Sequence, residues 1–268
     1  MSSGIDKKDI ARSFGSAAAS YDSAAHFQRR VGNRLFEMLP DSGANILDLG
    51  CGTGFFVPRL KEKYPAKQIM AMDLSDKMLS YAKEHRHQDG VFWCAGDADH
   101  LPLRSESIDT IYSSLALQWC FDLDRLFGEL HRVLTPGGVC VFSTLLDQTL
   151  YELKTAWENV DLANQHVNDF FSEDDYRAAL QMAGFDIPFF ERTRDVLWYD
   201  SVRQLTTELK HIGAHNVNRK RSTHLTGKSR VRSLINGYET FRSDEGRLPA
   251  TYYVAYFGIR KPEFEQNG

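Results

Sequence analysis

The stretch LDLGCGTGFF, residues 47–56, packs three glycines into five positions directly after an apolar run. An apolar run that ends in glycines is typical of a buried strand that leads into a sharp turn. Without a Cβ, Gly50 and Gly52 allow the backbone to turn tightly and to come within van der Waals distance of a ligand. Asp48, two residues before the first glycine, can orient the turn or meet an ammonium group. The stretch therefore predicts a ligand-binding turn at the end of a strand.

Two familiar glycine-rich motifs do not match this stretch. The dinucleotide fingerprint G-x-G-x-x-G/A needs a third small residue, which lets helix and strand close together. Here that position is Phe55, and the third glycine is Gly54 in a G-x-G-x-G pattern. A phosphate-binding P-loop is excluded as well, because no Gly-Lys-Ser/Thr follows the turn. A similar GKS at 227–229 has Ser222 where the P-loop requires a glycine.

Strand-like and helical segments alternate along the middle of the chain. Short apolar runs at 44–49, 68–73, 91–95, 108–114 and 139–145 predict strands, and segments near 56–64, 75–85 and 122–133 show helical spacing. Such βα units favour an α/β fold, a parallel sheet with helices on both faces. A parallel sheet of this kind binds ligands beyond the carboxyl ends of its strands, where the glycine turn lies.

The flanking segments follow a different pattern. Apolar spacing predicts helix over 6–38, broken into two pieces near 15–20. After residue 145 we expect helices at 150–163 and 172–183, a strand at 187–198 and a polar, helix-rich insertion at 201–243. The insertion is too polar to be core. The aromatic stretch ATYYVAYFGI, 250–259, has no helix after it, so it suits an antiparallel strand at a sheet edge.

Length and composition are those of a globular protein with one sizeable domain. The 268 residues are 42% hydrophobic and 25% charged. We expect one domain over 1–268, with a helical cover at 1–40, a ligand-binding core at 41–145 and a substrate-side half at 146–268. A net charge of −4 argues against general nucleic-acid binding, and no apolar run is long enough for a membrane helix or signal peptide. Four cysteines without a CxxC pair favour a reduced, cytoplasmic protein.

Acidic residues follow the first three predicted strands. Asp73 ends the second strand, where a carboxylate accepts the hydroxyl groups of a ribose. Asp97 follows the third strand and can pair with an adenine amino group, while Asp48 can meet an amino-acid ammonium. The set suits a nucleoside, a cationic sulfur and an amino acid, with no phosphate grip. These are the parts of S-adenosylmethionine, which is therefore the predicted cofactor.

The motifs LDLGCGTG, AMDLS and GDADHLPL resemble those of the class I S-adenosylmethionine-dependent methyltransferases. The resemblance implies a Rossmann-like, seven-stranded, mostly parallel sheet whose last strand is antiparallel, with helices on both faces. It also implies a helical N-terminal cover and a helical insertion before the last strand. The predicted cofactor-binding residues are Tyr21, Asp48, Gly50, Cys51, Gly52, Gly54, Asp73, Leu74, Asp97, Ala98 and Ser113.

Four further segments are similar to the malonyl-[acyl-carrier protein] O-methyltransferase family of biotin synthesis. They are ARSFGSAAASYDSAAHFQR (11–29), SSLALQWC (113–120), STLLDQTLYELKTAW (143–157) and LKHIGAHN (209–216). One departure is Thr53, where the family often has proline, and it affects only a turn residue. The resemblance implies methylation of the free carboxylate of a malonyl thioester on its carrier protein. The resulting ester is extended toward pimelate, so the activity serves biotin synthesis.

This reaction needs no general base, because a carboxylate with a pKa near 4 is about 99.9% ionised at pH 7. No Ser-His-Asp or nucleophilic cysteine pattern is present in the sequence to suggest one. Holding oxygen, methyl carbon and sulfur in line, in a pocket poor in water, would favour transfer. The candidates for positioning the acceptor are Tyr21, Gln118, Trp119, His166 and Lys210, together with His211 and His215. The two latter histidines have a metal-binding spacing but no third ligand, so no metal is predicted.

The segment 218–232 is basic in an otherwise acidic chain. A solvated charged face explains many such runs, and nucleic-acid binding lacks interleaved aromatic residues here. Carrier proteins are acidic, so a basic segment beside the pocket would steer their docking. The predicted docking residues are Arg219, Lys220, Arg221, Lys228, Arg230 and Arg232.

Two other classes of function remain open at this stage. A methyltransferase that acts on another small acid, a quinone precursor or RNA would share the same core motifs. A protein that binds the cofactor or a carrier protein without catalysis is the second alternative.

Overall fold

In the computed structural model, residues 6–41, 43–65, 67–158, 160, 167–214 and 228–263 are described. Within these ranges, seven strands form one sheet in the order β3-β2-β1-β4-β5-β7-β6. Every strand predicted from the sequence is present, although β5 begins earlier than the predicted residue 139. The strands are β1 (Asn45–Leu49), β2 (Gln68–Asp73), β3 (Val91–Ala95), β4 (Ile108–Ser114), β5 (Leu134–Leu145), β6 (Asp186–Tyr199) and β7 (Leu248–Arg260).

The pairing of the strands confirms the predicted sheet. β1 runs parallel to β2 and β4, β3 parallel to β2, and β5 parallel to β4. The last strand, β7, is antiparallel to both β5 and β6. The expectation that it lies at a sheet edge is wrong, because β6 is the edge strand. Most β7 residues are buried whichever face they point to, as expected for an interior strand, whereas those of β6 are largely exposed or half-buried.

Helices connect and flank these strands, with ends where the sequence places capping residues. The side chain of Ser75 accepts a hydrogen bond at the start of α4, and that of Asp122 does so at the start of α5. Pro58 lies in the first turn of α3, where a helix tolerates proline. The helices are α1 (Lys7–Ala24), α2 (His26–Phe36), α3 (Val57–Lys63), α4 (Asp76–His85), the short 3₁₀ turn η1 (Leu117–Trp119), α5 (Leu123–Val133), α6 (Tyr151–Glu158), α7 (Glu173–Met182), α8 (Val202–His211) and α9 (Lys228–Glu239).

The predicted break near 15–20 in the N-terminal helix is wrong. Helix α1 continues through this region, and the chain breaks at Ala25, between α1 and α2. Gly15 is buried within α1, and a Cβ at this position would lie 2.8 Å from the hydroxyl oxygen of Ser75. Gly15 therefore allows α1 to pack closely against the start of α4, and it does not end the helix.

The core has one hydrophobic cluster on each face of the sheet. Neighbouring residues of β1 point to opposite faces, so Ile46 joins one cluster and Leu47 joins the other. Helices α2, α3 and α6 contribute buried side chains to the first cluster, and α5 and α7 contribute to the second. Both faces of the sheet are therefore covered, as the sequence predicted.

The expectation that the insertion at 201–243 is too polar to be core is wrong in part. Val202 and Leu205 of α8 and Leu234 and Tyr238 of α9 are buried in the first hydrophobic cluster. Their spacing puts a narrow apolar face on each helix, and the polar remainder faces solvent. The sequence prediction used the average polarity of the segment, and this average does not reveal a few apolar residues that share one face of a helix.

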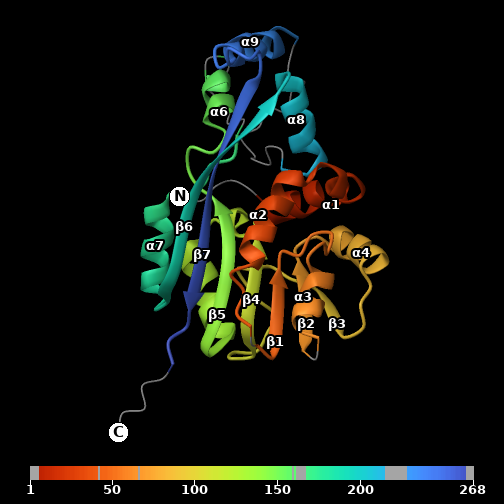
Figure 1. The fold of residues 1–268 in the computed structure, drawn as a ribbon, viewed down its shortest axis with the longest axis vertical. Helices are drawn as coiled ribbons and strands as arrows, with labels where there is room; N and C mark the ends of the chain where they lie inside the picture. Colours follow the sequence, from red (N-terminus) through yellow and green to blue (C-terminus); the bar gives the residue numbers. More distant parts are fainter. Residues whose placement is uncertain are drawn as a thin grey trace.

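The helices that matter for the site lie beyond the carboxyl ends of the parallel strands (Figure 1). There α1 and α2 cross above β1 and β4, and α1 packs against α8. The long strands β6 and β7 extend past the rest of the sheet toward α6, α8 and α9. No helix among the described residues combines the length and the apolar character that crossing a membrane requires.

The stacked rings of Phe142 and Phe257 test the packing of the second cluster. Both residues are fully buried, and their ring centroids are 4.9 Å apart. Removing a buried phenylalanine ring leaves a cavity, so Phe142→Ala should lower the free energy of unfolding by about 3–5 kcal/mol in urea denaturation. The control Phe92→Ala removes a side chain that is 55% exposed and should cost under about 1 kcal/mol. Equal losses at the two positions would contradict this assignment of the core.

Candidate active site

The glycine turn follows β1 and adopts the backbone conformation that the sequence predicts. Gly50, Gly52 and Gly54 have φ angles of +77°, +53° and +71°, a region that side chains other than glycine rarely adopt. A Cβ at Gly50 would come within 2.2 Å of the Ala116 Cβ, and one at Gly54 within 2.9 Å of Trp93. A Cβ at Gly52 would meet nothing within 4 Å. Gly52 is thus the turn glycine that faces open space.

Asp73, at the end of β2, holds the glycine turn through its carboxylate. One oxygen accepts the backbone N–H of Gly52 at 2.9 Å, and the other accepts that of Ser75 at 2.8 Å. Each carboxylate oxygen can accept further hydrogen bonds, so both remain available to a ligand. Burial raises the pKa of Asp73 above its ordinary value, although these two N–H groups oppose the shift.

Asp48 lies deeper in β1 and is 3% exposed. Burial, together with the nearby charge of Asp73, raises the pKa of Asp48 to about 8. A cationic group close to this pair would favour the ionised form of both carboxyl groups. The two acids therefore make the end of the first two strands receptive to positive charge.

Asp97 follows β3 and is already engaged by a residue of α1. The ammonium group of Lys7 lies 2.9 Å from a carboxylate oxygen of Asp97 and 2.9 Å from one of Asp99. The Lys7 side chain also lies 3.7 Å from the sulfur of Cys120. An adenine amino group would have to share Asp97 with this lysine.

These groups surround a cavity that we call the glycine-turn cavity. Asp73, Leu74, Asp97 and Ala98 line it from the strand ends, together with Gly50 and Gly52 of the turn. On the opposite side α1 contributes Lys7, Ile10, Phe14 and Tyr21, which recur at helical spacing on one face of the helix. Lys7 is the one basic side chain among the described lining residues, and its charge is matched by Asp97 and Asp99. The cavity thus offers carboxylates and apolar surface.

The two phenylalanines after the glycine turn do not close this cavity. Phe56 packs against Tyr112, with ring centroids 5.4 Å apart, and beneath the backbone of Gly32. Phe55 lies under the guanidinium group of Arg29, 5.4 Å from ring centroid to carbon. Neither phenylalanine is among the lining residues of the cavity.

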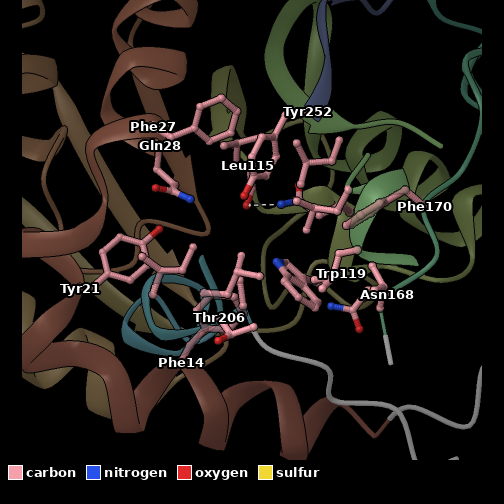
Figure 2. A pocket seen from close by; sticks show the side chains of 18 of the residues that line it. Phe14, Tyr21, Phe27, Gln28, Leu115, Trp119, Asn168, Phe170, Thr206 and Tyr252 are labelled. Atoms are coloured by element: carbon pink, nitrogen blue, oxygen red, sulfur yellow. Dashed lines mark hydrogen bonds between the residues drawn. The ribbon is translucent and has the colours of Figure 1, made fainter. Parts of the chain in front are cut away.

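A second cavity, which we call the aromatic cavity, adjoins the first (Figure 2). Figure 2 shows Tyr21 and Trp119 facing each other across its open space, with Phe27 and Tyr252 at one end. The two cavities share the four residues Phe14, Tyr21, Leu115 and Trp119 in their walls. A ligand in either cavity would therefore be able to contact these four shared side chains.

Three of the predicted acceptor-site residues line the aromatic cavity: Tyr21, Gln118 and Trp119. The amide nitrogen of Gln118 donates to the backbone oxygen of Leu115 at 2.8 Å, and its buried amide oxygen has no hydrogen-bond partner in the described structure. Burial raises the pKa of Tyr21, and the charges of Asp73 and Asp22 raise it further. Its hydroxyl therefore stays protonated at neutral pH and can donate a hydrogen bond.

Other predicted residues lie elsewhere. Lys210 and His211 are exposed on α8 and do not line either cavity. Ser113 is fully buried and donates to the backbone oxygen of Leu49 at 2.7 Å, while its neighbour Ser114 lines the glycine-turn cavity. Asp48, Cys51 and Gly54 lie in or next to the glycine turn and do not line the cavity. His166 and His215 fall outside the described residues.

Most of the predicted docking segment lies outside the described residues. Arg219, Lys220 and Arg221 lie outside the described residues, as does the side chain of Lys228 at the start of α9. Arg230 and Arg232 lie on α9 and are exposed to solvent.

The sequence analysis missed several residues that line the two cavities. Lys7 and Phe14 share one face of α1 with Ile10 and Tyr21, so helical spacing contained the signal for both. Asn168 lines the aromatic cavity, and its buried amide oxygen has no hydrogen-bond partner in the described part of the chain. It lies among the described residues 167–172, which form no helix or strand before α7 and carry no periodic signal in the sequence.

The side chains that line the two cavities limit the reactions that the site can support. Neither cavity has a serine–histidine or cysteine–histidine pair among its described lining residues. Within the described residues, no group of three or more His, Cys, Asp and Glu side chains is placed to hold a metal ion. The glycine-turn cavity has open space at Gly52 and carries the carboxylates of Asp73 and Asp97, which are able to accept hydrogen bonds from hydroxyl and amino groups. The arrangement suits a reaction that depends on the alignment of two ligands.

Comparisons with known proteins agree with this description. The "Methyltransferase domain" family model matches residues 47–142. A malonyl-[acyl-carrier protein] O-methyltransferase of Hahella chejuensis is 41% identical over 251 residues, which cover 93% of this chain and 89% of that protein. The biotin biosynthesis bifunctional protein BioHC of Cellvibrio japonicus is 43% identical over 98% of this chain. The chain spans only 52% of that bifunctional protein's length.

Solved structures show the same fold at low sequence identity. The YcgJ protein of Bacillus subtilis is 16% identical, with a TM-score of 0.60 over 87% of this chain and 98% of that one. A geranyl diphosphate C-methyltransferase from Streptomyces coelicolor, solved with S-adenosyl-L-homocysteine, has a TM-score of 0.53 and 16% identity over 86% of this chain and 76% of that one. These likenesses confirm the Rossmann-like methyltransferase fold.

Family membership follows from the relative that matches this chain over nearly its whole length. The alignment with this relative covers 93% of the chain, so it extends beyond the glycine turn and the sheet into the N-terminal helices and the insertion. These outer elements also form the walls of the aromatic cavity, through α1, α2 and α8. The chain belongs to the malonyl-[acyl-carrier protein] O-methyltransferase family.

Proposed function

We propose that this protein transfers the methyl group of S-adenosylmethionine to the free carboxylate of a malonyl group held as a thioester on an acyl-carrier protein. The product is the malonyl methyl ester on the carrier, an intermediate that serves biotin synthesis. The observation that carries the proposal is the wall that the two cavities share, formed by Phe14, Tyr21, Leu115 and Trp119. A donor and an acceptor on either side of this wall would lie in contact.

The glycine-turn cavity would hold the cofactor. Asp73 would accept the ribose hydroxyl groups, Asp97 the adenine amino group, and Gly52 would leave space for the ligand beside the turn. Leu74 and Met78 offer apolar surface for the base. S-adenosylmethionine supplies an electrophilic methyl group on its sulfonium; as the carboxylate oxygen bonds to the methyl carbon, the carbon–sulfur bond would break and S-adenosylhomocysteine would leave with the electron pair.

The aromatic cavity would hold the malonyl end of the acceptor. Its carboxylate is ionised at neutral pH, so no side chain has to remove a proton. The protonated hydroxyl of Tyr21 can donate to one carboxylate oxygen and leave the other free to react. Phe27, Trp119 and Tyr252 keep water away from the carboxylate, which favours the dispersal of charge during transfer. The chain therefore contributes alignment and desolvation.

The first experiment tests the acceptor. Purified protein is incubated with methyl-labelled S-adenosylmethionine and with malonyl-, acetyl- or unacylated carrier protein. We expect label on the malonyl carrier alone, because only this acceptor has a free acyl carboxylate. A malonyl carrier that already bears the methyl ester is the matched control and should stay unlabelled. Equal labelling of all carriers, or of none, would refute the proposal and favour another acceptor or a binding role.

The second experiment tests the ribose assignment. Asp73→Ala removes the two carboxylate oxygens that would accept hydrogen bonds from the ribose. The binding free energy of the cofactor, measured by calorimetry, should therefore weaken by about 3 kcal/mol, which is a loss of affinity of about 100-fold.

The matched control is Asp109→Ala. The Asp109 carboxylate also accepts two backbone N–H groups, those of Ala44 and Asn45, but it lies at the opposite end of the sheet. This variant loses comparable structural bonds and should bind the cofactor with unchanged affinity. Unchanged affinity in Asp73→Ala, or an equal loss in both variants, would contradict the ribose role.

The third experiment tests whether the basic segment docks the acidic carrier protein. Reversing Arg219, Lys220 and Arg221 to glutamate should raise the KM for the malonyl carrier about tenfold at low salt and leave kcat nearly unchanged. The effect should shrink as salt screens the charges.

A control with the same change of charge reverses Lys67, Arg104 and Arg260. These residues are exposed near the opposite end of the sheet. This control should leave the KM for the carrier nearly as it is in the parent protein. A similar rise in KM for both triple variants would indicate a general effect of net charge, and no rise in either would exclude docking by this segment.

A further inference from the structure

In the motif LKHIGAHN, 209–216, the described residues 209–214 form the end of helix α8, and its apolar residues rather than its charged ones face the aromatic cavity. The charged side chains of Lys210 and His211 face solvent, whereas Leu209, Ile212 and Ala214 line the aromatic cavity. The helix closes with a Schellman motif: the N–H of Gly213 bonds the oxygen of Lys210, and that of Ala214 bonds the oxygen of Leu209. Gly213 has the positive φ angle of +70° that this motif requires.

Gly213 also lies against the backbone of α1. A Cβ at Gly213 would come within 2.9 Å of the Phe14 Cα, 3.1 Å of the Phe14 nitrogen and 3.1 Å of the Ser13 oxygen. These are backbone atoms within a helix, which cannot rotate away as a flexible side chain can. The buried hydroxyl of Ser13 donates to the Gly213 oxygen at 2.8 Å, and that of Ser20 donates to the His211 oxygen at 2.9 Å. The close approach and the hydrogen bonds hold the same two segments together.

The residue beneath Gly213 is Phe14, one of the four residues that line both cavities. The ring of Phe14 lines both cavities and packs edge to face against Trp119, with centroids 5.2 Å apart. Trp119 also lines both cavities. A shift of the backbone at Phe14 would therefore move the wall at which the two ligands meet.

We propose that Gly213 is a positioning residue for methyl transfer. Together with Ser13 it forms a backbone lock that fixes Phe14, and through Phe14 also Trp119, between cofactor and acceptor. The α8 end of the insertion thus sets the alignment of the two ligands without touching the reacting atoms. The inference rests on the proposed function for the identity of these ligands, and it explains why a glycine ends α8 directly over α1.

The chain offers a closely matched control for this lock. Gly184 ends α7 with the same Schellman motif and a φ angle of +79°. A Cβ at Gly184 would meet only the His131 ring nitrogen, at 3.9 Å, an ordinary contact. Gly184→Ala and Gly213→Ala therefore carry the same backbone strain, and only the second pushes against α1.

The experiment compares the two variants by thermal unfolding, by calorimetric binding of S-adenosylhomocysteine, and by turnover with malonyl carrier protein. Both variants should lose thermal stability through the strained φ angle, and Gly213→Ala should lose more because its Cβ also pushes against the backbone of α1. Only Gly213→Ala should bind S-adenosylhomocysteine about fivefold more weakly and show about tenfold lower kcat at saturating substrates, because small displacements at a reacting wall are costly to alignment. Equal binding and equal kcat in the two glycine variants would overturn the lock.

Ser13→Ala provides a second route if Gly213→Ala does not fold. It removes the hydroxyl that binds the Gly213 oxygen and adds no bulk. We expect weaker binding of S-adenosylhomocysteine and lower kcat in the same direction, about two- to threefold. Unchanged binding and kcat in Ser13→Ala would also overturn the lock. If the unsubstituted protein does not bind S-adenosylhomocysteine, the proposed function falls and the lock falls with it.

Discussion

The carboxylate of Asp73, at the end of β2, forms hydrogen bonds that hold the glycine turn after β1 beside the start of α4. The rest of the site is arranged around these bonds. The carboxylate accepts the N–H groups of Gly52, after β1, and of Ser75, at the start of α4. Both bonds use backbone donors that would otherwise be unsatisfied at the beginning of a turn and of a helix. The bonds hold Gly52 in its left-handed conformation with open space beside it. The cavity floor is thus rigid, while the ligand-facing sides of the same carboxylate stay available.

The roof of the site is made by elements far away in sequence. Helix α1 lies over both cavities, and its position depends on contacts at several points along its length. Near its start Lys7 pairs with Asp97 and Asp99, and in its middle Ser13 meets the end of α8. Near its end Asp22 pairs with Arg86. The site therefore has acidic groups in its floor, Asp73 and Asp97, and aromatic groups of α1 in its roof, Phe14 and Tyr21.

Local pattern was enough for much of this arrangement. The strands β1 to β5 were predictable because buried parallel strands contain apolar runs bounded by glycine or capping residues. The caps Ser75 and Asp122 and the first-turn Pro58 are local features that need no tertiary contact to be identified. The position of Asp73, Asp97 and Gly52 around one cavity was predictable as well, since the carboxyl ends of parallel strands meet at one edge of the sheet. The sequence predictions that were wrong concern residues whose local pattern is compatible with two different structures. Gly15 looked like a helix breaker and is a point of close packing, and the insertion looked polar and carries a narrow buried face.

By itself, the sequence determined the sheet, the glycine turn and the carboxylates that follow the strands, because these depend on residues close together along the chain. Only the tertiary structure decided which side chains the two cavities share, that Lys7 already engages Asp97, and that Lys210 faces away from the site. It also brought Gly213 against the backbone of Phe14, which lies about two hundred positions earlier in the chain. Contacts of this kind depend on how helices pack, and packing is set by the shapes of surfaces that no single segment contains.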